Sequence, residues 1–365
     1  MKTLIFSLST GRGHDKAAEN LRNLYFAAGY EAKIIDGMHV VSPFLDKMVV
    51  SGYSAMANTT PSLYGKAYNI TDRSQSQKII SPLLSKISKN KISVLIRKEN
   101  PDLLVSTHPF MVPVIGQLKK ENRVDLPFIS IVTDYKAHEL YIHNQVDAYI
   151  VGSPYTKVAM IQRGISGNKI YPSGIPISQE YYQKSGRNKK EVFQLIVMAG
   201  SIGYDYITKA VRELLKIEKP IHIVALCGDH AKIIETMENH FSKEIAKNKL
   251  SVLGFVDNMA DLMEESHCVL SKPGGLTTTE SIHKNLPMIL PYCVPGQEQD
   301  NLNFLVRNNM AISASTPESI RNTVEDFIDH PEKLQAMAQN MKKLSDSLNP
   351  EKIIEISNEL KKPSL

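Results

Sequence analysis

Two glycine-rich turns, one in each half of the chain, constrain the fold more than any other feature. The first covers residues 9–14 and reads Ser-Thr-Gly-Arg-Gly-His, and the second covers residues 271–280 and reads Ser-Lys-Pro-Gly-Gly-Leu-Thr-Thr-Thr-Glu. Each follows a short apolar run and precedes a stretch with helical periodicity, which is typical of a strand, glycine turn and helix unit. One such unit in each half predicts two α/β domains that face each other across a cleft, an arrangement suited to group transfer.

Short apolar runs separated by helix-compatible sequence continue through the first half of the chain. The first run, residues 4–8, is followed by a helical pattern that Gly29 ends. Further runs cover residues 32–35, 102–106, 128–132 and 148–151. Continuous apolar runs of this length are typical of strands buried on both faces of a parallel sheet. We therefore expect a doubly wound α/β domain in this half.

The second half repeats this pattern, with apolar runs at residues 193–198, 221–226, 251–255, 268–270 and 288–290. Between the halves, residues 171–176 contain two prolines and a glycine, which indicates a hinge, and we place the domain boundary near Ser173. The expected organisation is an N-terminal domain at 1–172, a C-terminal domain at 173–345, and a C-terminal helix within 346–365 that packs back on the first domain.

Composition excludes several classes of protein. The three cysteines, Cys227, Cys268 and Cys293, form no close pair, which argues against disulfides and favours a cytoplasmic protein. Cys227 and His230 have the spacing of metal ligands, but they lie at the end of an apolar strand, and we expect no metal. The net charge of +5 favours acidic partners without indicating nucleic acid. No apolar stretch is long enough to span a bilayer, so any membrane contact is expected to be peripheral.

A basic segment interrupts the alternation of strands and helices. Residues 38–100 lack a strand-like run, and six basic residues without any acidic one lie between Lys78 and Lys98. Such a stretch can lie on an anionic membrane surface. It can equally be a core-facing helix whose basic side is solvated, and the residues alone do not decide between the two.

His14 is the residue of the first turn best placed for chemistry. It lies where the first strand meets its helix, at the sheet edge where ligands of α/β domains bind, and imidazole can accept a proton from an alcohol. The alternative is a histidine that merely begins the helix. The turn also resembles part of a dinucleotide fingerprint, with Asp36 as the ribose-binding carboxylate, but Lys16 occupies the position of its third glycine.

The second turn has the features of a phosphate and ribose site. Gly274 and Gly275 would expose backbone amides at a helix N-terminus, which binds phosphate. The threonines from Thr277 onward add hydroxyl donors, and Glu280 can accept two hydrogen bonds from a ribose diol. The alternative is a simple turn and cap with Glu280 on the solvent face.

Two more turns point to the same cleft. Residues 199–203 read Ala-Gly-Ser-Ile-Gly and offer backbone amides and a hydroxyl to a second phosphate. Residues 295–301 read Pro-Gly-Gln-Glu-Gln-Asp-Asn and suit the hydroxyls of a sugar, although an ordinary polar loop would have the same composition.

With these four motifs in order, the chain resembles the processive diacylglycerol glucosyltransferases and monogalactosyldiacylglycerol synthases, a family 28-like group related to the peptidoglycan N-acetylglucosaminyltransferase. Residues 9–14 are similar to the family's Gly-x-Gly-His turn, and Thr133-Asp134-Tyr135 with His138 is similar to its Thr-Asp-aromatic motif. Residues 272–280 and 295–301 resemble its donor motifs. The chain departs from the family in having no tryptophan, so that Tyr141 stands where an aromatic often follows the Thr-Asp motif.

This resemblance implies a GT-B fold, with two Rossmann-like domains facing across a cleft. It also implies an inverting transfer of a hexose from UDP-glucose or UDP-galactose to a membrane lipid alcohol, diacylglycerol, giving a β-glycolipid without a metal. The protein would be peripheral on the inner face of the cell membrane and would meet its anionic surface through residues 40–100. Two alternatives remain: a UDP-sugar epimerase on the same scaffold, and a non-enzymatic lipid or nucleotide sensor.

The resemblance also assigns site residues. His14 would be the general base, with Asp134 as an orienting or alternative carboxylate. Glu280 would hold the uridine ribose. The resemblance further implies a set of donor-binding residues and divides them among uracil, diphosphate and sugar. They are Gly13, Gly200, Ser201, Phe255, Val256, Gly274, Gly275, Thr277, Glu280, Glu298, Gln299 and Asn301.

Overall fold

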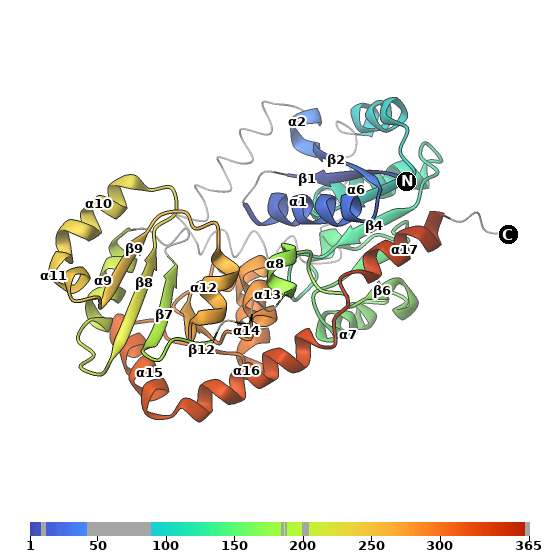
Figure 1. The fold of residues 1–365 in the computed structure, drawn as a ribbon. Helices are drawn as coiled ribbons and strands as arrows, with labels where there is room; N and C mark the ends of the chain where they lie inside the picture. Colours follow the sequence, from blue (N-terminus) through green and yellow to red (C-terminus); the bar gives the residue numbers. More distant parts are fainter. Residues whose placement is uncertain (9–11, 42–88, 184–185, 187, 199–203, 362–365) are drawn as a thin grey trace.

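A computed structural model describes residues 1–8, 12–41, 89–183, 186, 188–198 and 204–361. Within these residues the chain forms two six-stranded sheets, one from each half, with flanking helices (Figure 1). The two sheets are the α/β architecture that the two glycine-rich turns predict.

The first sheet has the strand order β2-β1-β3-β4-β5-β6, and all neighbouring strands are parallel. Its strands are β1 (Lys2–Ser7), β2 (Glu31–Asp36), β3 (Leu103–Ser106), β4 (Phe128–Ile131), β5 (Ala148–Ile150) and β6 (Ile170–Tyr171). Its helices are α1 (Arg12–Ala27), α2 (Gly37–Val41), α6 (Met111–Lys120), α7 (Pro154–Gln162), the short η1 (Glu139–Tyr141) and η2 (Gly167–Lys169), and a further helix at 89–99.

The second sheet has the order β12-β11-β10-β7-β8-β9 and is also parallel. Its strands are β7 (Phe193–Met198), β8 (Ile221–Leu226), β9 (Leu250–Leu253), β10 (Cys268–Leu270), β11 (Met288–Leu290) and β12 (Ala311–Ser313). The helices after β6 are α8 (Gln179–Tyr182), α9 (Tyr204–Leu214), α10 (Ala231–His240), α11 (Ser242–Ala246), α12 (Met259–Glu265), α13 (Gly275–His283), α14 (Gln297–Arg307), α15 (Pro317–Asp329), α16 (Pro331–Ser345) and α17 (Lys352–Lys361).

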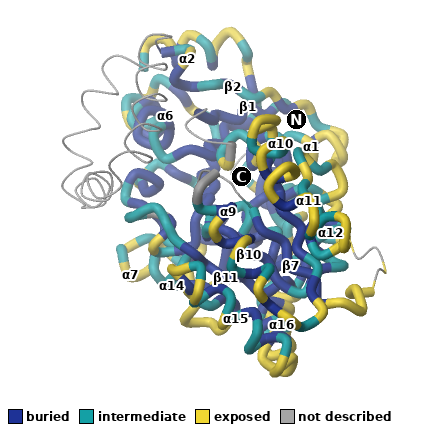
Figure 2. The backbone as a smooth tube through the Cα atoms, turned by 90° about the vertical axis from the view of Figure 1, so that its left-hand side faces the viewer, coloured by how far each residue is buried: buried dark blue, intermediate teal, exposed yellow. Residues whose placement is uncertain are grey.

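Burial explains why the strands are recognisable in the sequence. Every residue of β3, β4, β5, β10 and β11 is buried, so these strands have no solvent face and read as continuous apolar runs. In Figure 2 the strands form the dark interior, while α10 and α11 are largely exposed. The expected strand at 251–255 begins earlier in the structure, as β9, and two short strands, β6 and β12, were not expected.

Strand order fixes where a ligand can bind. In an open parallel sheet, the crevice lies at the carboxyl ends of the strands where the order of connections reverses. In the first sheet β1 has β2 on one side and β3 on the other, and in the second sheet β7 lies between β8 and β10. The glycine turn containing His14 follows β1, and the turn beginning at Ser271 follows β10. His14 and the second predicted turn therefore lie at a reversal point, while residues 9–11 of the first turn and residues 199–203, after β7, lie outside the described residues.

The C-terminal helix crosses back to the first half of the molecule. Figure 1 shows the chain leaving α16 beside the second sheet and reaching α17 beside the first. Ile353 and Ile356 are buried in the cluster that contains Leu21 of α1. The hydroxyl groups of Tyr25 and Ser357 lie 2.7 Å apart. Near the hinge, Asn20 Nδ2 donates a hydrogen bond of 3.2 Å to the backbone oxygen of Pro176.

The described part of the basic segment, residues 89–99, packs against the first core. Ile92 and Ile96 are buried there, Lys89 pairs with Glu121 at 2.6 Å, and Lys91 donates to the backbone oxygen of Val41. These contacts fit the core-facing alternative for this part, whereas residues 42–88 lie outside the described residues. Across the described residues, no helix combines the length and the apolar character needed to cross a membrane.

Candidate active site

His14 lies in the first turn of α1, and the carboxyl ends of β3 and β4 supply its hydrogen-bond partners. Nδ1 of His14 lies 3.0 Å from the backbone oxygen of Thr107, which follows β3, and 3.1 Å from Oγ1 of Thr133, which follows β4. The ring also meets the ring of His108 edge-on, with 4.4 Å between centroids. Because β1, β3 and β4 are parallel neighbours, their carboxyl ends share one sheet edge, and this is what gathers the three segments.

Burial makes His14 a neutral imidazole. The pKa of His14 is lowered, chiefly because burial disfavours the charged ring, while the backbone oxygen of Thr107 and the carboxylate of Asp15 oppose the shift. The pKa of His108 lies well below its ordinary value, because of burial first and the nearby His14 second. A neutral imidazole has one nitrogen with a free lone pair and can therefore act as a proton acceptor.

Asp134 contacts the second half of the molecule rather than His14. Its Oδ1 accepts a hydrogen bond of 3.2 Å from Nδ2 of Asn301, which is fully buried in α14. The same amide nitrogen donates to the backbone oxygen of Pro273, and Oδ1 of Asn301 accepts from the backbone N–H of Tyr135. The resemblance puts a carboxylate beside the base, but the groups at Nδ1 of His14 are oxygens of Thr107 and Thr133. Asn301 therefore joins the two halves in this structure.

The second glycine turn meets the Thr-Asp motif directly. Gly274 caps α13, which begins at Gly275, so this turn does form a helix N-terminus as predicted. A Cβ added at Gly275 would overlap the backbone oxygen of Thr133, whereas one added at Gly274 would meet nothing within 4 Å. Glycine at position 275 thus permits the close approach of the two halves.

One further contact fastens α13 to the first half, and another fastens α14 to it. The hydroxyl of Thr279 lies 3.0 Å from that of Tyr135, and the ring of Tyr135 stacks on Phe304 of α14 with 4.3 Å between centroids. Thr277 is partly exposed in the first turn of α13. The start of α13 therefore lies next to Thr133, the residue that contacts His14.

Glu280 lies between charged residues of α8 and α1. Burial, and secondly the carboxylate of Glu180, raise the pKa of Glu280 to about 7, and Lys16 opposes the shift. The residue as a whole is of intermediate burial. This arrangement differs from the alternative of a solvated glutamate, because a freely solvated carboxylate would keep its ordinary pKa.

The predicted sugar-binding loop is held by an ion pair. Lys272 Nζ lies 2.5 Å from Oε1 of Glu298, whose Oε2 accepts a hydrogen bond of 2.8 Å from the backbone N–H of Val294. Glu298 is 8 % exposed, while its neighbour Gln299 is exposed and contacts Cys293. Glu298 thus fixes the loop against the donor turn, whereas the amide of the exposed Gln299 accepts from Cys293 and donates to Asn303.

Of the remaining predicted residues, two follow β9, one directly precedes His14 in α1, and two lie outside the described residues. Phe255 follows β9 and is 70 % exposed, and Val256 packs against the second-half core. Gly13 is exposed in α1, and an added Cβ there would meet nothing within 4 Å. Gly200 and Ser201 belong to the segment that the structure does not describe.

Sequence reasoning missed two contributors to the surroundings of His14 and named a third, Tyr141, only as the aromatic residue after the Thr-Asp motif. Thr107 and His108 directly follow β3, and Tyr141 reaches the hydroxyl of Thr133 at 2.7 Å. The signal was available, because a Ser-Thr-His sequence at the end of a buried parallel strand must lie at the same edge as His14.

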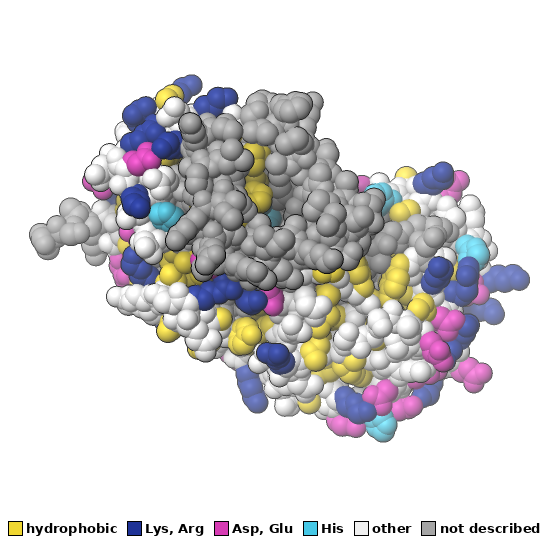
Figure 3. Space-filling view, turned by 180° about the vertical axis from the view of Figure 1, so that it is seen from behind, with side chains coloured by type: hydrophobic (Ala, Val, Ile, Leu, Met, Phe, Trp, Pro, Cys, Tyr) yellow, Lys and Arg dark blue, Asp and Glu magenta, His cyan; other side chains and the backbone are white. Residues whose placement is uncertain are grey.

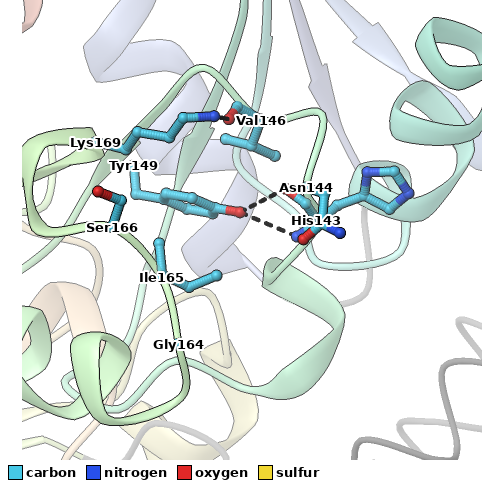
Figure 4. A pocket seen from close by; sticks show the side chains of 8 residues that line it. All are labelled: His143, Asn144, Val146, Tyr149, Gly164, Ile165, Ser166 and Lys169. Carbon is cyan, nitrogen blue, oxygen red and sulfur yellow. Dashed lines mark hydrogen bonds between the residues drawn. The ribbon is translucent and has the colours of Figure 1, made fainter.

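A separate cavity of about 230 Å³ lies on the first half, between the segment after η1 and the segment between α7 and β6. Figure 4 shows its lining, which includes His143, Tyr149, Ser166 and Lys169. Tyr149 exchanges hydrogen bonds with the backbone of His143, and Lys169 donates to the backbone oxygen of Val146. None of the predicted site residues lines this cavity.

Charged side chains are unevenly distributed over the surface seen in Figure 3. They are dense at the two far ends of the molecule, whereas the described surface between the ends carries mainly uncharged and hydrophobic side chains.

Comparison with solved structures identifies the architecture. The chain matches the crystal structure of Acinetobacter baumannii MurG with a TM-score of 0.65 at 15% identity, over 99% of this chain and all of the other. It matches the Staphylococcus aureus MnaA structure with UDP with a TM-score of 0.63 at 14% identity, over 99% and 97% of the two chains. The two six-stranded parallel sheets, together with these matches, identify the GT-B fold.

Sequence comparison narrows this class to a family. The profile of the monogalactosyldiacylglycerol synthase family matches residues 14–177, and that of the glycosyltransferase family 28 C-terminal domain matches residues 194–350. Processive diacylglycerol beta-glucosyltransferases from Bacillus pumilus and Bacillus subtilis are each 27% identical over 97% of this chain and 94% of their own length. The first half of the chain thus carries a domain of the monogalactosyldiacylglycerol synthase family, and the second half carries a glycosyltransferase family 28 C-terminal domain. Nearly the whole chain is similar to processive diacylglycerol beta-glucosyltransferases.

Proposed function

We propose that the protein transfers a hexose from a UDP-sugar to diacylglycerol, with inversion at the anomeric carbon. In this reaction the acceptor oxygen forms a bond to the anomeric carbon while the bond from that carbon to UDP breaks. The proton of the acceptor hydroxyl passes to His14, and UDP leaves with the electron pair. The product is a β-glycosyl diacylglycerol. The protein acts at the surface of the membrane that contains its acceptor.

The observation that carries this proposal is the junction at Thr133. Its side chain contacts Nδ1 of His14 on one side, and its backbone oxygen touches Gly275, at the N-terminus of α13, on the other. An anion-binding helix end and a neutral imidazole therefore belong to one continuous group of residues from the two halves. A transferase needs this juxtaposition, because the base must reach an acceptor placed beside the donor.

The roles follow from the surroundings of each residue. We assign the diphosphate to the backbone at Gly274 and Gly275 and the ribose to Glu280. The sugar is assigned to Gln299, because Gln299 is exposed whereas Glu298 and Asn301 are buried and hydrogen-bonded to other parts of the protein. Phe255 and Val256 would meet uracil through their backbone, and Thr277, Gly13, Gly200 and Ser201 would complete the donor site.

Mass spectrometry of the lipid product tests the proposal. The purified chain would be incubated with diacylglycerol in vesicles and with UDP-glucose, UDP-galactose or both. A hexosyl diacylglycerol is the expected product, and the donor that yields it identifies the sugar. The His14→Ala variant should lose activity by about 100-fold or more, because general base catalysis contributes about 10²- to 10⁴-fold.

Two controls separate the competing functions. Incubation with a UDP-sugar and no acceptor detects an epimerase, since an epimerase alters the sugar nucleotide without a lipid. Equal glycolipid formation by the wild type and by His14→Ala would contradict the assignment of the base. Binding of UDP and lipid without any product from either donor would favour a sensor.

A further inference from the structure

The geometry around Nδ1 of His14 determines which ring nitrogen carries the proton. A backbone carbonyl oxygen can only accept a hydrogen bond, and that of Thr107 lies 3.0 Å from Nδ1. If Nδ1 were unprotonated, two lone pairs would face each other at this distance. The contact therefore requires Nδ1–H, which leaves the lone pair of the neutral ring on Nε2.

Thr133 provides a second oxygen for the same N–H group. Its Oγ1 lies 3.1 Å from Nδ1 of His14 and 2.7 Å from the hydroxyl of Tyr141. Thr133 and Tyr141 are 5 % and 1 % exposed, so little water competes with these contacts. Tyr141 is itself held by η1, and its backbone oxygen accepts a bond of 3.4 Å from Ser130. The hydroxyl of Thr133 is thus fixed by a buried neighbour rather than free to rotate.

We propose that Thr133, supported by Tyr141, is a positioning residue that acts with the Thr107 carbonyl to hold the proton of His14 on Nδ1 and so to keep Nε2 available as the proton acceptor. This inference rests on the proposed function for its catalytic meaning. Two neutral oxygens take the place at Nδ1 where the resemblance suggests a carboxylate. When Nε2 takes the acceptor proton, the ring becomes an imidazolium, and both oxygens at Nδ1 stabilise it through hydrogen bonds to a charged donor.

Two other titratable groups, Asp15 and His108, lie near the His14 ring. Asp15 on α1 favours the charged ring, but its Oδ1 already accepts a hydrogen bond of 2.7 Å from Ser7. His108, after β3, has a strongly lowered pKa and stays neutral, and its Nδ1 accepts from the backbone N–H of Phe110. The oxygens of Thr107 and Thr133 are therefore the groups that hydrogen-bond the ring at Nδ1.

Nitrogen NMR of histidine-labelled protein tests the tautomer without any need for activity. The signals of His14 would be assigned by their loss in His14→Gln. We expect the wild type to show a protonated Nδ1 and an unprotonated Nε2 at neutral pH. In Thr133→Val, which keeps the shape of the side chain but removes the hydroxyl, the pKa of His14 should fall, because the imidazolium loses a hydrogen-bond partner.

Kinetics provide the second measurement. Thr133→Val should lower kcat by about tenfold, with a smaller change in KM for the UDP-sugar, because the lost bond strengthens in the transition state. The acid limb of the pH profile of kcat/KM should move to lower pH with the pKa of His14. Thr133→Ser, which retains the hydroxyl, should restore both. Thr3→Val is the matched control, because Thr3 is also buried and its Oγ1 has no hydrogen-bond partner among the described residues.

Each outcome decides the inference. A wild-type ring protonated at Nε2 would overturn it, and so would a Thr133→Val variant that matches Thr3→Val in both the His14 signals and the pH profile. If the protein formed no glycolipid with any donor, the proposed function would fail, and the NMR measurement would still show whether Thr133 and Thr107 hold the proton on Nδ1.

Discussion

Among single residues, Glu280 gives the clearest pH dependence of UDP binding. Its pKa of about 7 means that it is charged above this pH and protonated below it. A protonated carboxyl loses acceptor capacity toward two ribose hydroxyls. We therefore expect the Kd of UDP to rise as pH falls below about 7, by up to about tenfold per pH unit. Calorimetric titration with UDP at pH 8, 7 and 6 measures this effect, and a Kd that stays constant over this range would contradict the ribose assignment.

Glu180 provides a matched test of the cause. Its negative charge raises the pKa of Glu280, so Glu180→Gln should shift the onset of weaker UDP binding to lower pH.

The raised pKa of Glu280 also affects the stability of the folded protein. Folded Glu280 keeps its proton up to about pH 7, above the 4.5 of an unperturbed glutamate, so the free energy of unfolding should decrease as pH rises through this window. Glu280→Gln should remove that part of the slope.

At the scale of elements, the contact between α13 and the Thr-Asp motif depends on Gly275. A methyl group there would overlap the backbone oxygen of Thr133, and neither backbone can yield without moving one half of the molecule. We expect Gly275→Ala to separate the two halves, to increase the radius of gyration seen by small-angle scattering, and to abolish most transfer activity. Gly274→Ala is the spatial control, because its methyl group would meet nothing within 4 Å, and the radius of gyration should stay unchanged.

The N-terminus of α13 is the reason why we expect the transfer reaction to need no metal. Unpaired N–H groups and the helix dipole can stabilise the charge that develops on the UDP leaving group. We expect a chelator such as EDTA to leave the rate of glycolipid formation within about twofold, since this helix end supplies the stabilisation that a cation would otherwise provide. A rate that falls with EDTA and returns with added Mg²⁺ would contradict this expectation.

Most elements were predictable because their burial leaves a strong pattern. The runs at 193–198, 221–226, 268–270 and 288–290 coincide with β7, β8, β10 and β11. β6 and β12 were missed because two or three residues are too few to show any periodicity. The side chains that meet across the junction, such as Asn301 with Asp134, depend on how the halves pack together. The order of motifs predicted that they face each other, but not that Asn301 is buried between them.

At the scale of the whole molecule, α17 contributes to the stability of the first half. Ile356 is buried against α1, and removing its side chain beyond Cβ should lower the free energy of unfolding by about 2–4 kcal/mol. Urea titration of Ile356→Ala measures this change. Glu359→Ala, on the exposed side of the same helix, should change it by less than about 0.5 kcal/mol. Equal effects of the two substitutions would show that α17 does not stabilise the first half.

The path of α17 has a mechanical consequence. The polypeptide passes between the halves twice, once before β7 and once between α16 and α17. Two points of attachment permit rotation about the line that joins them and resist translation or twisting. Entry of a sugar nucleotide and release of UDP should therefore proceed by swinging about this single axis, which returns the Thr133 carbonyl to Gly275 in the same register after every turnover.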